Sequence, residues 1–175
     1  MMKLLPYFLF LMSLTALAQE NQSINWDEAT INNKLTLTIS KRDFEAIYKK
    51  DYIVRSPTED ETCGTADEAS VKMLDFKDVS FEVDNNILNF RNIVFSKNNK
   101  GFFLAYKNSR FDERMTLDTF KKLFANAVAL SAENTTVIAN QIILAVPDSQ
   151  NADDSWEFVF VNNNLKSIRY NFSCE

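Results

Sequence analysis

The sequence of 175 residues contains no histidine, and this absence excludes several kinds of site at once. Serine and cysteine nucleophiles that depend on an imidazole base are ruled out, and so are metal sites with imidazole ligands. Only two glycines occur, Gly64 and Gly101, at unrelated positions. A phosphate-binding loop or a dinucleotide fingerprint needs more glycines at fixed spacing. We therefore expect no enzyme activity, no catalytic residue, no cofactor and no metal.

Aromatic residues are abundant where glycine is scarce. The chain has fifteen phenylalanines, with 46% apolar and 25% charged residues. These proportions are typical of a globular protein, and the aromatic content favours strands. The length is enough for one domain with a real core.

The first eighteen residues form a predicted signal peptide. Lys3 is followed by an apolar run over 4–17, and Ala16 and Ala18 stand at the positions that a signal peptidase reads. The run is shorter than the roughly twenty residues of a membrane span, and no cysteine follows it as a lipid attachment point. We expect cleavage before Gln19, no membrane anchor afterwards, and a periplasmic or extracellular location. The acidic net charge, −5 before cleavage, argues against nucleic acid and anionic membranes as partners.

The predicted export indicates a structural role for the two cysteines. Cys63 and Cys174 are the only pair, and an oxidising compartment favours a disulfide between them. A redox or nucleophilic thiol would need a CxxC spacing or an activating histidine, and the chain has neither.

Two helices stand out by their first residues and their apolar spacing. Ser40 is a predicted N-cap, with Phe44, Ile47 and Tyr48 on one helix face. Thr116 opens a second helix with one apolar stripe: Leu117, Phe120, Leu123, Phe124, Ala127 and Val128. Residues 19–34 are polar and are predicted to be flexible. Strands are expected at 35–39, 70–75, 79–83, 87–95, 102–106, 138–146, 156–161 and 165–172.

The two helices and the hairpins that follow them suggest an internal duplication. Ser40 and Thr116 are 76 residues apart, and the segments 83–91 and 161–169 align at an offset of 78 residues. Chance similarity between amphipathic helices and between asparagine-rich turns is the alternative. We predict an α+β domain over 35–175, with helix-plus-meander repeats at 40–106 and 116–172. The repeats would form one antiparallel sheet with both helices on one face.

This pattern resembles a known family. A helix opened by Thr116 that carries Leu123 and Phe124, followed by 156–158 and an asparagine-turn hairpin, is similar to the repeat of the beta-lactamase-inhibitor-protein-like fold. The family favours glycines where this chain has 125–126 and 162–164, and the first half has no equivalent of Trp156. The resemblance implies a secreted or periplasmic protein that binds another protein on a concave sheet, such as an inhibitor or an immunity factor.

The last hairpin indicates which side chains share a face. A three-residue loop over 162–164 pairs Trp156 with Tyr170, Phe158 with Ile168 and Glu157 with Arg169, which groups apolar residues into a core stripe. The opposite face is then the candidate protein-binding face. It comprises Glu157, Val159, Val161, Leu165, Ser167 and Arg169, with Tyr106 and Phe103 as neighbours. The loop over 55–68 could instead cover this face and make it a second small core.

A second interpretation places the chain in a different functional class. A cone-shaped sheet, cystatin-like or nuclear-transport-factor-like, could hold a small ligand or use two carboxylates as acid and base. The candidate acids lie in two loops: Glu59, Asp60, Glu61, Asp67 and Glu68, and Asp148, Asp153 and Asp154. Neither loop has EF-hand spacing, and solvated acids are the simpler interpretation. Sequons at Asn21, Asn134 and Asn171 have a meaning only in a eukaryotic source, and we favour a bacterial one.

Export and oxidation can be tested together by the intact mass of protein purified from the periplasm or the medium. The mass should correspond to a chain that begins at Gln19 and is lighter by two hydrogens, because Cys63 and Cys174 are joined. Two reactive thiols in the native, unreduced protein would contradict the disulfide.

Overall fold

A computed structural model describes residues 23–58, 61, 71–96, 101–131, 136–138, 141–151 and 153–172. The predicted signal peptide, Cys63, Cys174, Asn21 and Asn134 lie outside these residues. Within them, antiparallel sheet dominates and helices are few, which confirms the predicted α+β class at that level.

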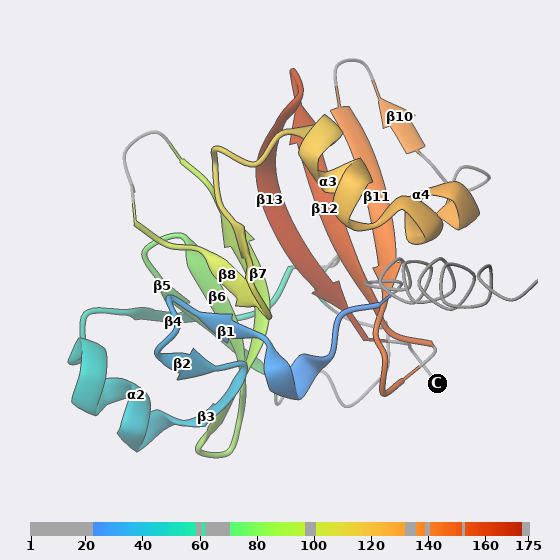
Figure 1. Ribbon diagram of the computed structural model, residues 1–175. Coiled ribbons are helices and arrows are strands. Elements are labelled where there is room, and N and C mark those ends of the chain that lie inside the picture. The colour runs from blue at the N-terminus through green and yellow to red at the C-terminus, as the bar shows by residue number, and fades with distance from the viewer. Residues whose placement is uncertain are drawn as a thin grey trace, which may run out of the picture.

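A nine-stranded antiparallel sheet forms the body of the molecule (Figure 1). Its order is β10-β11-β12-β13-β7-β6-β5-β4, and β3 pairs with β7 beside this path. β13 and β7 pair directly, at Ile168 and Ile93. The strands are β3 (Thr38–Ser40), β4 (Ile53–Arg55), β5 (Lys72–Phe76), β6 (Val79–Asp84), β7 (Ile87–Val94), β10 (Thr136–Ile138), β11 (Gln141–Pro147), β12 (Ser155–Val161) and β13 (Asn164–Asn171).

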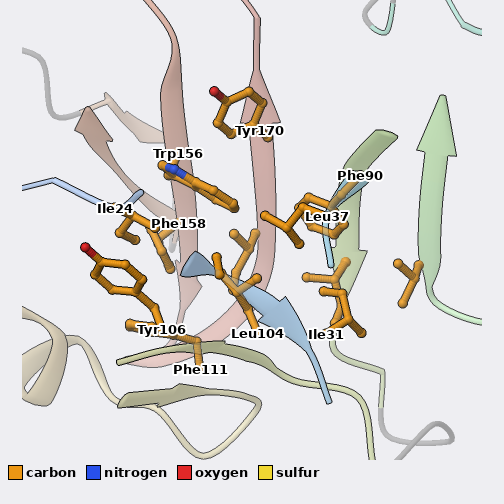
Figure 2. Close-up of a cluster of buried hydrophobic side chains, with 14 of the residues drawn as sticks. Ile24, Ile31, Leu37, Phe90, Leu104, Tyr106, Phe111, Trp156, Phe158 and Tyr170 are labelled. Carbon is orange, nitrogen blue, oxygen red and sulfur yellow. The ribbon is translucent and has the colours of Figure 1, made fainter. Parts of the chain in front are cut away.

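A second, four-stranded sheet covers part of the first and was not predicted. Its order is β2-β1-β8-β9 (Figure 1). The strands are β1 (Thr30–Ile31), β2 (Leu35–Thr36), β8 (Leu104–Tyr106) and β9 (Ser109–Phe111). The core lies between the two sheets, where Ile31, Leu104 and Phe111 of the small sheet share one buried cluster with Phe90 and Phe158 of the large one (Figure 2).

The N-terminal segment over 23–34 is part of this core, which corrects the prediction that these residues are flexible. Residues 19–22 of the predicted flexible segment lie outside the described residues. Ile24, Ala29 and Ile31 are completely buried. The Ile24 backbone N–H donates to the Pro147 carbonyl, and a 3-10 helix, η1 (Trp26–Glu28), leads into β1. The sequence does not indicate this burial, because only three residues over 23–34 are buried and they follow no regular spacing.

The helices begin where the sequence predicts. α2 (Lys41–Tyr48) is capped by Ser40, whose hydroxyl accepts a hydrogen bond from the Asp43 backbone N–H. Thr116 caps α3 (Leu117–Leu123) through the Thr119 N–H. The single second helix that we predicted is two helices, because Phe124 leaves helical geometry before α4 (Ala125–Ser131) begins.

Aromatic rings attach these helices to the large sheet. Phe44 of α2 contacts Phe76 and Phe81, with ring centroids 5.4 and 5.5 Å apart. The ring centroid of Phe120 on α3 lies 4.6 Å from that of Phe158 and 5.3 Å from that of Phe160. In the part of the chain that is described, no helix has the length and apolar character needed to cross a membrane.

Asparagines with positive φ angles replace glycine in the hairpin turns. Asn162 and Asn163 have φ values of 49° and 67° and form a two-residue turn between Val161 and Asn164. Both angles suit the type I′ turn that matches the twist of a hairpin, and asparagine tolerates this geometry better than most residues. The three-residue loop that we predicted is therefore wrong.

A β-bulge reconciles this short turn with the predicted pairing. Trp156 faces Tyr170, Glu157 faces Arg169 and Phe158 faces Ile168, as expected from the sequence. The register then shifts between Val159 and Phe160, so that Phe160 faces Leu165. An extra residue in one strand of a pair changes which side chains face inward beyond it. The predicted faces consequently hold at the far end of the hairpin and fail beside the turn.

Trp156 connects four parts of the fold. The centroid of its buried ring lies 6.1 Å from that of Phe90 on β7 and 4.8 Å from that of Tyr170 (Figure 2). The ring of Trp26 lies at a centroid distance of 5.8 Å. The indole Nε1 donates to the Asp148 carboxylate over 3.4 Å. This contact links the core to the loop that joins β11 and β12.

The replacement Trp156→Phe tests this central position. We expect a loss of about 2 to 3 kcal/mol in the free energy of unfolding, because the change leaves a cavity and removes the N–H donor of a buried carboxylate. Chemical denaturation measures the loss. Trp26→Phe is the matched control and should cost about 1 kcal/mol or less, because Trp26 is only half-buried and its Nε1 donates to an exposed threonine hydroxyl. Equal losses in the two variants would contradict the central role of Trp156.

Candidate binding face

The large sheet has two faces, and alternation along β12 separates them. Trp156, Phe158 and Phe160 point toward the core and are buried. Glu157, Val159 and Val161 point the other way, because successive strand residues lie on opposite faces. We call this second side of the large sheet the outer face.

Five of the predicted binding residues lie together on the outer face. Glu157, Val159 and Val161 are half-buried on β12. On β13, Ser167 faces Val159 and Arg169 faces Glu157 across the strand pair. Ser167 is half-buried and Arg169 is exposed. Glu157 and Arg169 form a row of opposite charges, and the next row pairs the apolar Val159 with the small polar Ser167.

The other three predicted residues do not belong to this face. Leu165 is 2% exposed, because the bulge turns it inward beside Phe160. Tyr106 is 4% exposed and lies on β8 of the small sheet, inside the core (Figure 2). Phe103 also lies away from the outer face. It is half-buried next to β8, with the Arg110 guanidinium 3.7 Å above its ring.

The structure adds neighbours that the prediction missed. Ile143 of β11 faces Val159, and Ala145 faces Glu157. On the other side, Val94 of β7 faces Ser167. A row across four strands therefore reads Ile143, Val159, Ser167 and Val94. The sequence of β11 contains this signal, since its apolar residues occupy both alternating positions, which is typical of a strand with two partly covered faces.

Much of the rest of the outer face is polar or charged, and several of its charges are paired. Met73 of β5, which lies opposite Arg55 and Glu82, is also on this face and is completely buried. Arg55 of β4 donates to Asp75 over 2.6 Å and donates two hydrogen bonds to the Glu61 carboxylate over 2.6 and 2.7 Å. Arg91 of β7 lies 3.0 Å from Glu82 of β6. Cross-strand pairing places Asn92, Ser80, Asp75 and Ile53 in one row that continues from Arg169 toward β4.

The candidate acids of the loop before β12 hold the loop in place. Asp148 accepts hydrogen bonds from the backbone N–H groups of Gln150 and Asn151 and from the Trp156 indole. Asp154 accepts one from the Tyr170 hydroxyl over 3.0 Å. Burial, strengthened by these two carboxylates, raises the pKa of Tyr170 far above its usual value. The loop is thus fixed by its own acids.

The remaining acids fall into three groups. Asp153 is exposed, and Glu61 is bound by Arg55. Glu59, Asp60, Asp67 and Glu68 lie outside the described residues. Among the residues that the structure does describe, no three acids or cysteines are close enough to hold a metal ion together.

The ion pair of Arg55 and Glu61 makes stability depend on pH. Hydrogen bonds from Arg55 lower the pKa of Glu61 from 4.5 to about 2. A depressed carboxyl pKa stabilises the fold above the unfolded value and loses this effect as the pH falls toward the folded value. We expect Glu61→Gln to cost on the order of 1 kcal/mol near neutral pH, because water reaches the pair. In acid titrations followed by denaturation, the difference from wild type should shrink between pH 4.5 and about 2. A difference that stays constant across this range would contradict the assignment.

Comparison of the chain with models of protein families, with curated proteins and with solved structures gives no match.

Proposed function

We propose that this chain is an exported, non-catalytic protein that binds a protein partner through the outer face of its large sheet. The observation that carries the proposal is the row of apolar side chains at Ile143 and Val159, with Val161 beside it and Val94 two strands away. Apolar side chains that remain accessible on a regular sheet face are typical of a surface used for recognition.

The composition of this surface suits a protein partner. Apolar residues form its centre, while Glu157 and Arg169 face each other at one side. Protein interfaces commonly combine an apolar centre with a polar rim that fixes orientation. A face with solvation as its only role would carry more lysine, glutamate and threonine at these positions. This surface has no cluster of basic residues that could bind a polyanion, and the net charge of the chain is acidic.

Packing on the opposite side supports the choice of the outer face. Phe44 of α2 and Phe120 of α3 both contact aromatic residues that point into the core. Direct ring contacts fill the space between the sheet and its cover, so the core side is used for stability. Recognition is then left to the other side of the sheet.

The arrangement of acids supports a non-catalytic role. Acid and base catalysis by two carboxylates needs groups in different environments that a substrate can reach. Asp148 and Asp154 are 4% and 6% exposed, and both accept hydrogen bonds from neighbouring groups. A buried carboxylate that is already satisfied in this way serves the fold.

We further propose that the chain arose by internal duplication, with both helices on one face of the joined sheet. In the first half, the Lys41 N–H donates to the Asn86 carbonyl, and Ser40 lies opposite Ile87. In the second half, the Leu117 N–H donates to the Asn163 carbonyl, and Thr116 lies opposite Asn164. In both halves the start of the helix is therefore bonded to the turn of the hairpin.

This shared connection supports the resemblance to the beta-lactamase-inhibitor-protein-like fold better than the short motif alone. Helix similarity or turn composition can arise independently, whereas a hydrogen bond between corresponding atoms of two elements depends on their relative placement. On this basis an inhibitor or an immunity factor is the proposed role, and binding on the sheet is the proposed mode.

The double variant Ile143→Lys with Val159→Lys tests the outer face. Both side chains are half-buried, and lysine can extend its charged end into water, so stability should change by about 1 kcal/mol or less. Proteins that co-purify with wild type from the native envelope or secreted fraction should be lost. Thermal unfolding and quantitative mass spectrometry of the co-purified material measure the two effects.

The matched control is Ser80→Lys, which adds a lysine to the polar half of the same face. It should retain the same proteins. The partner identified in this way is then purified and titrated against all three forms. A large loss of stability in the double variant would mean that the face is structural, and equal binding by the three forms would place recognition elsewhere.

A further inference from the structure

β4 ends the large sheet and carries the most exposed large apolar side chain among the described residues. Ile53 is 70% exposed, and the next residue, Val54, is 47% exposed. Consecutive strand residues point to opposite faces, so both faces of the sheet expose apolar groups at this edge. β4 pairs with β5 on one side, and in the described part of the chain no strand pairs with its other side.

This edge lacks the protection that sheet edges usually have. Natural proteins keep sheets from joining by placing lysine, proline or a bulge on the edge strand. The one charged residue of β4, Arg55, is bound to Asp75 and Glu61 and does not guard the edge.

We propose that β4 pairs antiparallel with β4 of a second copy of this chain, joining two large sheets into one. A two-fold axis perpendicular to a sheet keeps each side chain on its own face. One residue of β4 must therefore lie beside the axis and pair with the same residue of the second copy. Either Ile53 or Val54 can occupy this position.

Charge and apolar character favour the axis at Ile53. In that register Ile53 faces Ile53 of the second copy, Val54 faces Tyr52 and Arg55 faces Asp51. Apolar residues then meet apolar residues, and opposite charges lie across from each other. An axis at Val54 would place Ile53 against Arg55. Asp51 is exposed in the structure and Tyr52 is half-buried, so both are accessible from this edge.

The charges at the two ends of the paired segment have the same symmetry. Antiparallel pairing brings the beginning of one segment toward the end of the other, so Asp51 of each copy meets Arg55 of the second copy, which also binds Asp75 and Glu61 of its own chain. This self-complementarity supports a second copy as the occupant of the edge. The contact is short, and we expect a weak dimer that dissociates on dilution.

The dimer also enlarges the surface described above. Ile53 lies on the outer face, in the row that continues through Asp75 and Ser80. Joining two copies at this residue would extend the outer face without interruption from one chain into the other. The pairing of β4 is nevertheless independent of what the apolar row of β11 and β12 binds.

Sedimentation velocity over a wide range of concentrations tests the dimer. Wild type should shift from monomer to dimer as concentration rises, and Ile53→Lys should remain a monomer, because two lysines would meet on the axis. Ile87→Lys is the matched control. Ile87 is another exposed isoleucine, on β7 away from this edge, and its replacement should leave the dimer unchanged.

Cysteine cross-linking tests the register. Under oxidising conditions, Ile53→Cys should give a covalent dimer in which peptide mapping finds residue 53 linked to residue 53, and Val54→Cys should not give the equivalent link. Wild type that stays a monomer at every concentration would overturn the proposal. So would a dimer that Ile53→Lys leaves intact, or a link at residue 54 in place of residue 53.

Discussion

The indole ring of Trp156 stacks on the ring of Phe90, with the two ring planes 26° apart, across the junction where β13 meets β7. One ring comes from the β12–β13 hairpin and the other from the β6–β7 hairpin, so this contact connects the two halves of the large sheet. Trp26 and Tyr170 pack around the same ring. Three other parts of the fold contribute side chains to the same buried region: the small sheet, the N-terminal segment and the loop that carries Asp148. Their positions therefore depend on this aromatic centre.

A core of this kind determines where variation is tolerated. Rings that contact each other on the inner side of the sheet accept few substitutions, since each change leaves a gap or causes a clash. On the outer face, Ile143 and Val159 are only half-buried, so substitutions there disturb fewer packing contacts. The same holds for Ile53, which is 70% exposed at the margin of the sheet.

Local signals in the sequence were sufficient for some elements and insufficient for others. Ser40 and Thr116 begin helices as predicted, because capping depends on residues within one helical turn. The pairing of Trp156 with Tyr170 also follows from alternation along two long strands. The small sheet could not be predicted, because β1 and β2 have two residues each and show no period. Leu165 was placed on the wrong face by a bulge, and Tyr106 by the burial of every residue of β8.

The N-terminal segment has a consequence for how this chain folds. β1 pairs with β8, so that Thr30 lies opposite Ala105, and Ile24 bonds to Pro147 near the end of β11. These contacts close very large loops of intervening chain, whose entropy must be lost before the contacts form. Proteins with such distant pairings fold slowly, because no short segment can complete its own sheet. A growing chain would therefore carry Ile24 and Ile31 without their partners until most of the sequence was available, and a chaperone that shields apolar segments would have its natural target there.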